Sequence, residues 1–211
     1  MKNVDILFED DDCLILNKPA GLAVQGGEGV GVSLDSLLAG EFPVRPLLVH
    51  RLDKDTSGAI LVAKHREAAS YYGKIIEGRE ILKIYNAVCG GSPVPSRGVI
   101  TLDVSVRGES KESRTEYKTL KAGSSFALLE LELGTGRMHQ IRKHLASIHH
   151  PIIGDDKYGD FAKNKIYRKE LGVKKLLLHA RKLRVPQRDG SIAEAEAPLP
   201  GYFEDFVVQN I

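Results

Sequence analysis

Residues 46–64 read PLLVHRLDKDTSGAILVAK. The apolar run from Ala59 to Ala63 is short and follows a turn signal, so it predicts a buried strand. Asp53 precedes that strand among basic residues, at the mouth of a rigid element, where reactive groups are often held. Asp55-Thr56-Ser57-Gly58 fits a type I turn, which gives Asp55 a structural task. Asp53 has no such task, and this motif alone favours a catalytic carboxylate and a structural salt bridge equally.

Length and composition indicate an ordinary globular protein. The chain has 211 residues, of which 42% are hydrophobic and 27% are charged, and this fits one large domain or two small ones. Cys13 and Cys89 lie far apart in apolar, strand-like runs, so we expect two buried reduced thiols rather than a disulfide or a metal pair. No apolar run approaches the length of a membrane span, and the first residues lack a secretion signal. We therefore expect a soluble, cytoplasmic protein.

Charge is distributed unevenly along the chain. Residues 1–42 hold 2 basic and 8 acidic residues, a net charge of −6, whereas residues 134–188 hold 14 basic and 4 acidic residues, a net charge of +10. Such a basic segment is typical of a protein that binds a polyanion. Scattered solvated lysines would give the same count, so charge alone leaves nucleic-acid binding as one of two equal interpretations.

Hydrophobic periodicity predicts an α+β fold with a mixed, largely antiparallel central β-sheet flanked by helices and loops. Strands are expected at 5–9, 13–17, 81–90, 99–106, 113–120 and 125–133, and another opens at Leu176. Helices are expected after Ser33 and at 65–77, 137–149, 161–171 and 199–209. Strands outnumber helices and mostly follow one another, which favours an antiparallel sheet.

The predicted helix at 137–149 has two different faces. Its apolar stripe consists of Met138, Ile141, Leu145 and Ile148. The other face carries Arg137, His139, Gln140, Arg142, Lys143 and His144. An arginine on this face could pair bidentately with a carboxylate and hold it ionised, although a solvated basic face is also common. The histidine spacing does not match a metal site.

Six segments together resemble the catalytic domain of the RluA family of pseudouridine synthases, in order from about residue 6 to residue 200. They are residues 17–22 (NKPAGL), 50–58 (HRLDKDTSG), 83–90 (KIYNAVCG), 136–145 (GRMHQIRKHL) and 150–155 (HPIIGD), followed by LLHA at 177–180. The chain departs from the family pattern at Met138, where threonine is common, and at Gln25, where histidine is common. The pattern begins almost at Met1, so we expect a single catalytic domain over 1–211 with the pseudouridine synthase fold and without the S4-like N-terminal domain that many relatives carry.

The resemblance implies a set of site residues. Asp53 falls on the catalytic aspartate, Tyr85 on the active-site tyrosine and Arg142 on the arginine that pairs with the aspartate. Leu178 is implied as an apolar contact beside the target base, and Arg51 is a candidate to fill the space left by the flipped nucleotide. Without the resemblance, Tyr85 would read as ordinary packing in an alternating strand. The further candidate substrate contacts are His50, Lys18, Lys83, Arg137, His139 and Gln140.

The function that this resemblance implies is isomerisation of specific uridines in structured RNA to pseudouridine. The base is detached from ribose, rotated and reattached through carbon 5, so neither a metal nor a nucleotide cofactor is expected. The substrate would be ribosomal or transfer RNA, with ribosomal RNA favoured, and a monomer is the default expectation. The alternatives are an RNA-binding or RNA-folding chaperone on the same scaffold, and an aspartate-nucleophile hydrolase, which the lack of a second acid or a phosphate loop disfavours.

Overall fold

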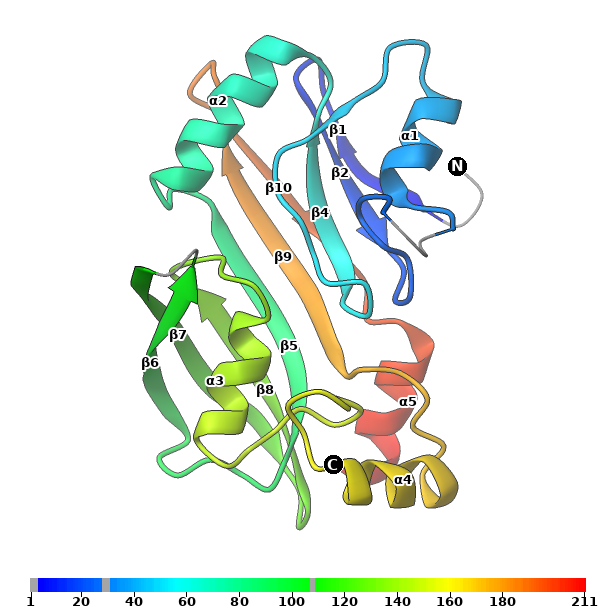
Figure 1. Cartoon of the computed structure of the whole chain (residues 1–211), viewed down its shortest axis with the longest axis vertical. Coiled ribbons are helices and arrows are strands. Elements are labelled where there is room, and N and C mark those ends of the chain that lie inside the picture. The colour runs from blue at the N-terminus through cyan, green and yellow to red at the C-terminus, as the bar shows by residue number, and fades with distance from the viewer. Residues whose placement is uncertain (1–3, 28–30, 107–108) are drawn as a thin grey trace. The chain divides into compact units, whose positions relative to one another are not determined.

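The computed structural model describes residues 4–27, 31–106 and 109–211. Within these residues there are ten strands and five helices. The fold is α+β, with a mixed and mostly antiparallel sheet (Figure 1). The chain divides into two compact units. Unit 1 comprises Met1–Lys83 and Ala180–Pro198, and unit 2 comprises Ile84–His179 and Leu199–Ile211. The expectation of a single domain over 1–211 stays a prediction.

Unit 1 is built on antiparallel strands whose order is β1-β2-β4-β9, with β10 paired to β9 and β3 paired to β4. Its elements are β1 (Asp5–Glu9), β2 (Cys13–Lys18), α1 (Leu34–Glu41), β3 (Leu47–Leu48), β4 (Ser57–Ala63), α2 (Arg66–Glu77), most of β9 (Leu178–Pro186) and β10 (Ile192–Glu196). All seven residues of β4 are buried, which confirms the predicted buried strand after Asp53. Ser33 caps α1 with a capping box, as expected.

The core of unit 1 lies between these strands and α2. Ala68, Tyr72 and Ile75 recur at helical spacing along α2 and are buried against strand residues such as Ile15 and Leu61. Burial of this continuous apolar surface makes the neighbouring strands a rigid base. Cys13 belongs to the same core, and both Cys13 and Cys89 are buried free thiols, which confirms that prediction.

Unit 2 contains the strand order β5-β8-β7-β6, again antiparallel. Its elements are β5 (Leu82–Gly90, beginning in unit 1), β6 (Arg97–Val106), β7 (Glu109–Ala122), β8 (Phe126–Leu133), α3 (Gln140–Ser147), α4 (Phe161–Glu170) and α5 (Gly201–Asn210). Helix α3 packs against β6 and β7, and α4 and α5 lie together at one end of the unit (Figure 1). Phe203 and Phe206 of α5 pack with Val88 and Phe126 in a second core.

Two expectations about local structure were wrong. Helix α3 begins at Gln140 rather than at 137, because His139 adopts a left-handed conformation (φ 54°) that a helix interior does not tolerate. Met138 therefore lies before the helix and is 62% exposed, while Ile141 and Leu145 are buried as predicted. The turn before β4 runs from Asp53 to Thr56 rather than from Asp55 to Gly58, since the Thr56 N–H donates to the Asp53 carbonyl over 3.2 Å.

The remaining predicted strands and helices are present with small shifts of their ends. The strands β3 and β10 were not predicted. β3 has only two residues, and the two buried positions of β10 are alanines, which are weak strand signals. None of the helices in the described residues is long and apolar enough to cross a membrane.

Candidate active site

Asp53 lies in the tight turn that leads into β4. Its side chain is half-buried, and its backbone carbonyl closes the turn by accepting from Thr56. Asp53 therefore occupies the first position of the turn, which the sequence had assigned to Asp55. The turn fixes the Asp53 backbone against a fully buried strand, so the carboxylate is presented from a rigid support.

Lys18 ties this turn to the end of β2. Its ammonium group donates to the carbonyls of Pro19, Leu22 and Lys54, over 3.0, 2.9 and 3.0 Å. The Gly21 N–H also donates to the Lys54 carbonyl, over 2.9 Å. All three N–H donors of the ammonium are thus used, and the side chain is 0% exposed.

Lys18 was expected to contact the substrate, and that role stays a prediction. Because carbonyls occupy all three donors of the buried ammonium group, the structure gives Lys18 a positioning role. Burial lowers the pKa of Lys18 to about 8, and the nearby carboxylates of Asp55 and Asp53 oppose that shift. The cation therefore lies within the electrostatic reach of Asp53 and stabilises the turn from inside.

His50 is a second internal support of this segment. Its Nε2 accepts from the Leu61 N–H of β4 over 2.9 Å, just past the point where β3 stops pairing with β4. Burial lowers the pKa of His50 to about 3, and the positive charge of Lys83 adds to that shift. The ring is therefore neutral at pH 7, and its acceptor is occupied by the backbone. Burial likewise lowers the pKa of Lys83, whose side chain is 8% exposed. Arg51, by contrast, is exposed beside the turn.

In unit 2, Arg142 of α3 is held by a carboxylate that the sequence did not single out. Its Nε donates to Oδ2 of Asp155 over 2.7 Å, and its Nη2 donates to Oδ1 over 2.8 Å. Asp155 also accepts from the backbone N–H groups of Lys157 and Tyr158, each over 3.0 Å. Burial alone would raise the pKa of Asp155, but these donors lower it below its ordinary value. The guanidinium therefore has a fixed, ionised anchor.

The segment before α3 is organised by Gln140. Its Oε1 accepts from the Thr135 hydroxyl over 2.6 Å and from the Arg137 N–H over 3.0 Å. Its Nε2 donates to the Arg114 carbonyl over 2.9 Å and to the Thr115 hydroxyl over 3.0 Å. All the hydrogen-bonding groups of the amide are paired within the protein, so Gln140 braces this segment, and the substrate contact expected from the sequence stays a prediction.

Arg137 and His139 come shortly before Gln140 in the chain. The Nε of Arg137 is buried and has no hydrogen-bond partner in the described part of the chain. His139 exchanges a hydrogen bond with the Tyr158 hydroxyl through Nδ1 over 2.9 Å. Both residues come just before α3, so the left-handed turn at His139 sets their direction.

Tyr85 and Leu178 are nearly buried on strands of unit 2. Tyr85 is 8% exposed on β5, opposite Leu131 of β8, and Leu178 is 3% exposed at the start of β9. The structure thus brings together Lys18 and Asp53 in unit 1, as well as His50 and Lys83. It brings the α3 residues together in unit 2. The expected pairing of Asp53 with Arg142 joins residues of different units and stays a prediction.

Sequence reasoning missed Asp155 and Tyr158 as functional neighbours of Arg142. Asp155 ends the HPIIGD segment that resembled the family, and Tyr158 follows it closely. A carboxylate at the end of such a segment was the signal available for the Arg142 partner, but its side-chain direction depends on the turn that brings it back to α3.

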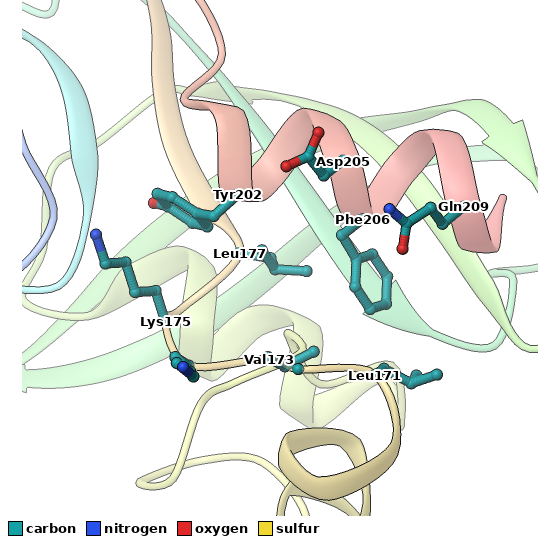
Figure 2. Close-up of a pocket in the computed structure, with 10 residues that line it drawn as sticks. Leu171, Val173, Lys175, Leu177, Tyr202, Asp205, Phe206 and Gln209 are labelled. Atoms are coloured by element: carbon teal, nitrogen blue, oxygen red, sulfur yellow. The ribbon is translucent and has the colours of Figure 1, made fainter.

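Two further features of the structure bear on the site. In the described ranges, no group of three or more His, Cys, Asp or Glu side chains is arranged to hold a metal ion. A cavity of about 310 Å³ lies in unit 2 between the segment 171–177 and α5 (Figure 2). Its floor is apolar, with Val173, Leu177 and Phe206, and none of the site residues predicted from the sequence lines it.

Comparison with known proteins identifies the family. The family model described as RNA pseudouridylate synthase matches residues 12–147, which is more than half of the chain. The chain belongs to the RNA pseudouridine synthase family. It is therefore an RNA pseudouridine synthase, an isomerase, and both the RluA-type resemblance and the predicted fold are confirmed.

Similar proteins come from several bacteria. The chain is 37% identical to the uncharacterized RNA pseudouridine synthase YhcT of Bacillus subtilis, over 93% of this chain and 69% of that protein. It is 37% identical to ribosomal large subunit pseudouridine synthase C of Vibrio parahaemolyticus, over 96% and 68%. It is 32% identical to ribosomal large subunit pseudouridine synthase D of Haemophilus ducreyi, over 97% and 70%.

A solved structure shares the fold of this pseudouridine synthase. Human RNA pseudouridylate synthase domain containing 4 matches with a TM-score of 0.81 and 28% identity, covering 96% of this chain and 91% of that one.

Proposed function

We propose that this pseudouridine synthase isomerises specific uridines of large-subunit ribosomal RNA. The synthases C and D to which it is similar are named for the large ribosomal subunit, and the match covers nearly all of this chain. Transfer RNA remains the second candidate substrate. A cytoplasmic location and a monomeric state belong to the proposal, and both units together serve as one catalytic domain.

Asp53 is the essential carboxylate in this proposal. The reaction breaks the bond between ribose and uracil nitrogen 1, so an ionised carboxylate is needed beside the sugar, either to attack it or to take a proton while the sugar is electron-poor. The observation that carries the assignment is the support under Asp53: a turn closed by its own carbonyl and tied, through the Lys54 carbonyl, to the buried ammonium group of Lys18. A surface salt bridge would need no such support.

Tyr85, Leu178 and Arg142 complete the proposed machinery. Tyr85 packs on the uracil face and helps to remove the carbon 5 proton after reattachment. Leu178 contacts the opposite side of the detached base and confines it. Arg142 pairs with Asp53 in the working enzyme. The bidentate bond of Arg142 to Asp155 supports this role, because it fixes the guanidinium plane before substrate arrives.

Arg51 and Arg137 are the proposed contacts to the RNA itself. Arg51 is exposed next to the catalytic turn, as a side chain that stacks in place of a flipped nucleotide must be. Arg137 has a buried Nε donor without a partner in the described residues, and an RNA oxygen would satisfy it. His139 and Lys83 remain proposed contacts, whereas Lys18, His50 and Gln140 act through the backbone that they hold.

The test compares Asp53→Asn with Asp55→Asn. The substrate is ribosomal RNA labelled with tritium at carbon 5 of uridine, and the readout is tritium release, because reattachment through carbon 5 expels that hydrogen. Asp53→Asn should abolish release while RNA binding persists, and Asp55→Asn should retain release within about tenfold. Substantial release by Asp53→Asn would refute the catalytic assignment.

A second measurement addresses the substrate. Pseudouridine positions are mapped in total RNA from cells with and without this gene. Loss of a position in large-subunit ribosomal RNA is expected, and loss confined to transfer RNA would overturn that part of the proposal. If the protein were an RNA-folding chaperone, removal of the gene would eliminate no pseudouridine from either RNA.

A further inference from the structure

Tyr158 lies at the centre of a cluster of cations in unit 2. The guanidinium carbon of Arg142 is 5.2 Å from the centre of the Tyr158 ring. The ammonium groups of Lys143 and Lys157 are 5.9 and 5.6 Å from the same centre. His139 meets the ring edge-on, with 5.5 Å between ring centres. One aromatic side chain thus gathers three cations and an imidazole.

The cluster is held by the turn that follows Asp155. The Asp155 carboxylate accepts from the backbone N–H groups of Lys157 and Tyr158, and it accepts twice from the Arg142 side chain. One carboxylate therefore fixes both the turn and the helix, α3, that carries Lys143. The ring position is set before any ligand binds, so the cations around it are pre-organised.

The charges of this cluster do not balance. Asp155 neutralises Arg142, but in the described residues no carboxylate lies within 4 Å of the ammonium group of Lys143 or Lys157. Both ammonium groups lie within 6 Å of one point, so they are less than 12 Å apart. Two positive charges this close raise the local positive potential, and an anion placed beside them is attracted by both. The cation–π contacts to Tyr158 compensate only part of the positive charge of the two ammonium groups.

We propose that Lys143 and Lys157 bind the phosphodiester backbone of the RNA substrate, with Tyr158 as the positioning residue between them. This inference deepens the proposed function and rests on it, since it places the backbone beside Arg142. Lysine ammonium groups recognise phosphate as point charges without base preference. The contact would hold the strand near the site while the target nucleotide is flipped.

The experiment measures the salt dependence of RNA binding. All variants are made in the full chain carrying Asp53→Asn, so that turnover does not alter the RNA. The probe is a fluorescently labelled RNA stem-loop with a uridine in its loop, and Kd is measured by anisotropy over a range of KCl concentrations. The double variant Lys143→Ala with Lys157→Ala is compared with Lys118→Ala and Lys121→Ala, which remove the same charge from exposed positions of β7 in the same unit.

We expect the slope of log Kd against log salt to change only in the double variant Lys143→Ala with Lys157→Ala. Each lost phosphate contact lowers the slope of log Kd against log salt by about 0.7–0.9, so loss of both lowers it by about 1.5. The affinity at low salt should fall at least about tenfold. Equal changes for the two pairs, or an unchanged slope for the Lys143 and Lys157 pair, would overturn the proposal. The corresponding Lys→Gln pair keeps the side-chain stems and replaces the Ala pair if the latter does not fold.

Two changes at Tyr158 test its positioning role. Tyr158→Phe keeps the ring and should leave the salt slope as it is, although it removes the hydrogen bond to His139. Tyr158→Leu removes the ring and should lower the slope by about half as much as the double lysine variant does. A slope that falls equally in both variants would contradict the role of the ring. Tritium release, measured separately in proteins that retain Asp53, tests the proposed isomerase function. A failure of that function can therefore be told apart from a failure of the proposed phosphate contact.

Discussion

Arg142 and Asp155 form a bidentate pair across the turn that follows α3, with N–O distances of 2.7 and 2.8 Å. The Asp155 side chain is 1% exposed and that of Arg142 is 10% exposed, so the pair is shielded from water. A shielded pair of this geometry fixes the plane of the guanidinium as well as its charge. Arg142, the proposed partner of Asp53, therefore has its direction set by a residue that need not touch the substrate.

Asp155→Asn should lower kcat far more than it changes KM. The amide keeps one acceptor but leaves a buried guanidinium without its counter-charge, and removal of one partner of a buried pair costs about 3–5 kcal/mol. We expect kcat to fall about 100-fold and the free energy of unfolding to fall by about 3 kcal/mol. Tritium release and urea denaturation measure the two effects.

The matched control for Asp155 is Asp156→Asn. Asp156 is the next residue, and its exposed carboxylate pairs with Arg168 and accepts from Asn164. Exposed pairs of this kind contribute less than about 1 kcal/mol, so both kcat and stability should change little. If Asp155→Asn and Asp156→Asn behaved alike, Asp155 would not be the anchor of Arg142.

Lys18→Met should weaken the turn that carries Asp53. The change removes three hydrogen bonds. It leaves the carbonyls of Pro19 and Leu22 without the Lys18 donor, while the Lys54 carbonyl keeps the Gly21 N–H. Each buried acceptor left unsatisfied costs about 1–3 kcal/mol, so we expect a loss of at least about 2 kcal/mol in unfolding free energy and a fall in kcat of about 100-fold. Denaturation curves and single-turnover tritium release measure these quantities.

Two companion variants separate the geometry of Lys18 from its charge. Lys18→Arg keeps the charge, but a planar guanidinium does not fit three converging carbonyls, so it should not restore kcat. Lys54→Met removes an exposed positive charge beside Asp53 and keeps the Lys54 carbonyl, so it should have little effect on stability. Recovery of activity by Lys18→Arg would show that charge alone is sufficient.

The sequence predicted the strand and the helix around the site better than the side-chain contacts within it. The buried strand β4 followed from an uninterrupted apolar run, and the α3 contacts of Ile141 and Leu145 followed from helical spacing. Met138 kept the same spacing by coincidence, because the left-handed residue His139 starts the helix only afterwards. Backbone conformations of this kind are set by side-chain braces such as Gln140, and periodicity carries no information about them.

The tasks of the charged residues were the least predictable part. Lys18 was a candidate substrate contact, yet its side chain is buried among three carbonyls. Asp155 looked like the end of a motif, yet it holds Arg142. In both cases the partner comes from a distant turn or helix, so the role depends on tertiary structure that no local pattern contains.

His50 should make the protein less stable in mild acid. Its folded-state pKa is lowered to about 3, while the unfolded ring titrates near its ordinary value of about 6.5. Between these values the unfolded chain binds a proton that the folded chain does not, so stability is complete above about pH 6.5 and is lost as the pH falls. We expect the free energy of unfolding to fall by about 2 kcal/mol between pH 6.5 and pH 5.

His50→Gln tests the source of this pH dependence. The glutamine oxygen can accept from the Leu61 N–H but does not titrate, so the stability of this variant should fall less steeply over the same range. His144, whose pKa burial lowers to about 4, still titrates in the same direction and leaves a residual slope. Urea denaturation at several pH values measures both slopes. Identical slopes in the two proteins would show that His50 does not titrate as proposed.

Gly58→Ala and Gly73→Ala should change stability in opposite directions. Gly58, at the start of β4, has φ +110°, and a Cβ there would lie 2.2 Å from the Ala180 carbonyl oxygen, which belongs to backbone that cannot move aside. Strain and overlap together should lower the free energy of unfolding by at least about 3 kcal/mol. Gly73 lies within α2, where a Cβ meets nothing within 4 Å, so alanine should raise stability by about 0.5–1 kcal/mol. Equilibrium urea denaturation compares the two variants directly, and a Gly58→Ala variant as stable as the parent protein would mean that β4 and β9 can separate at no cost.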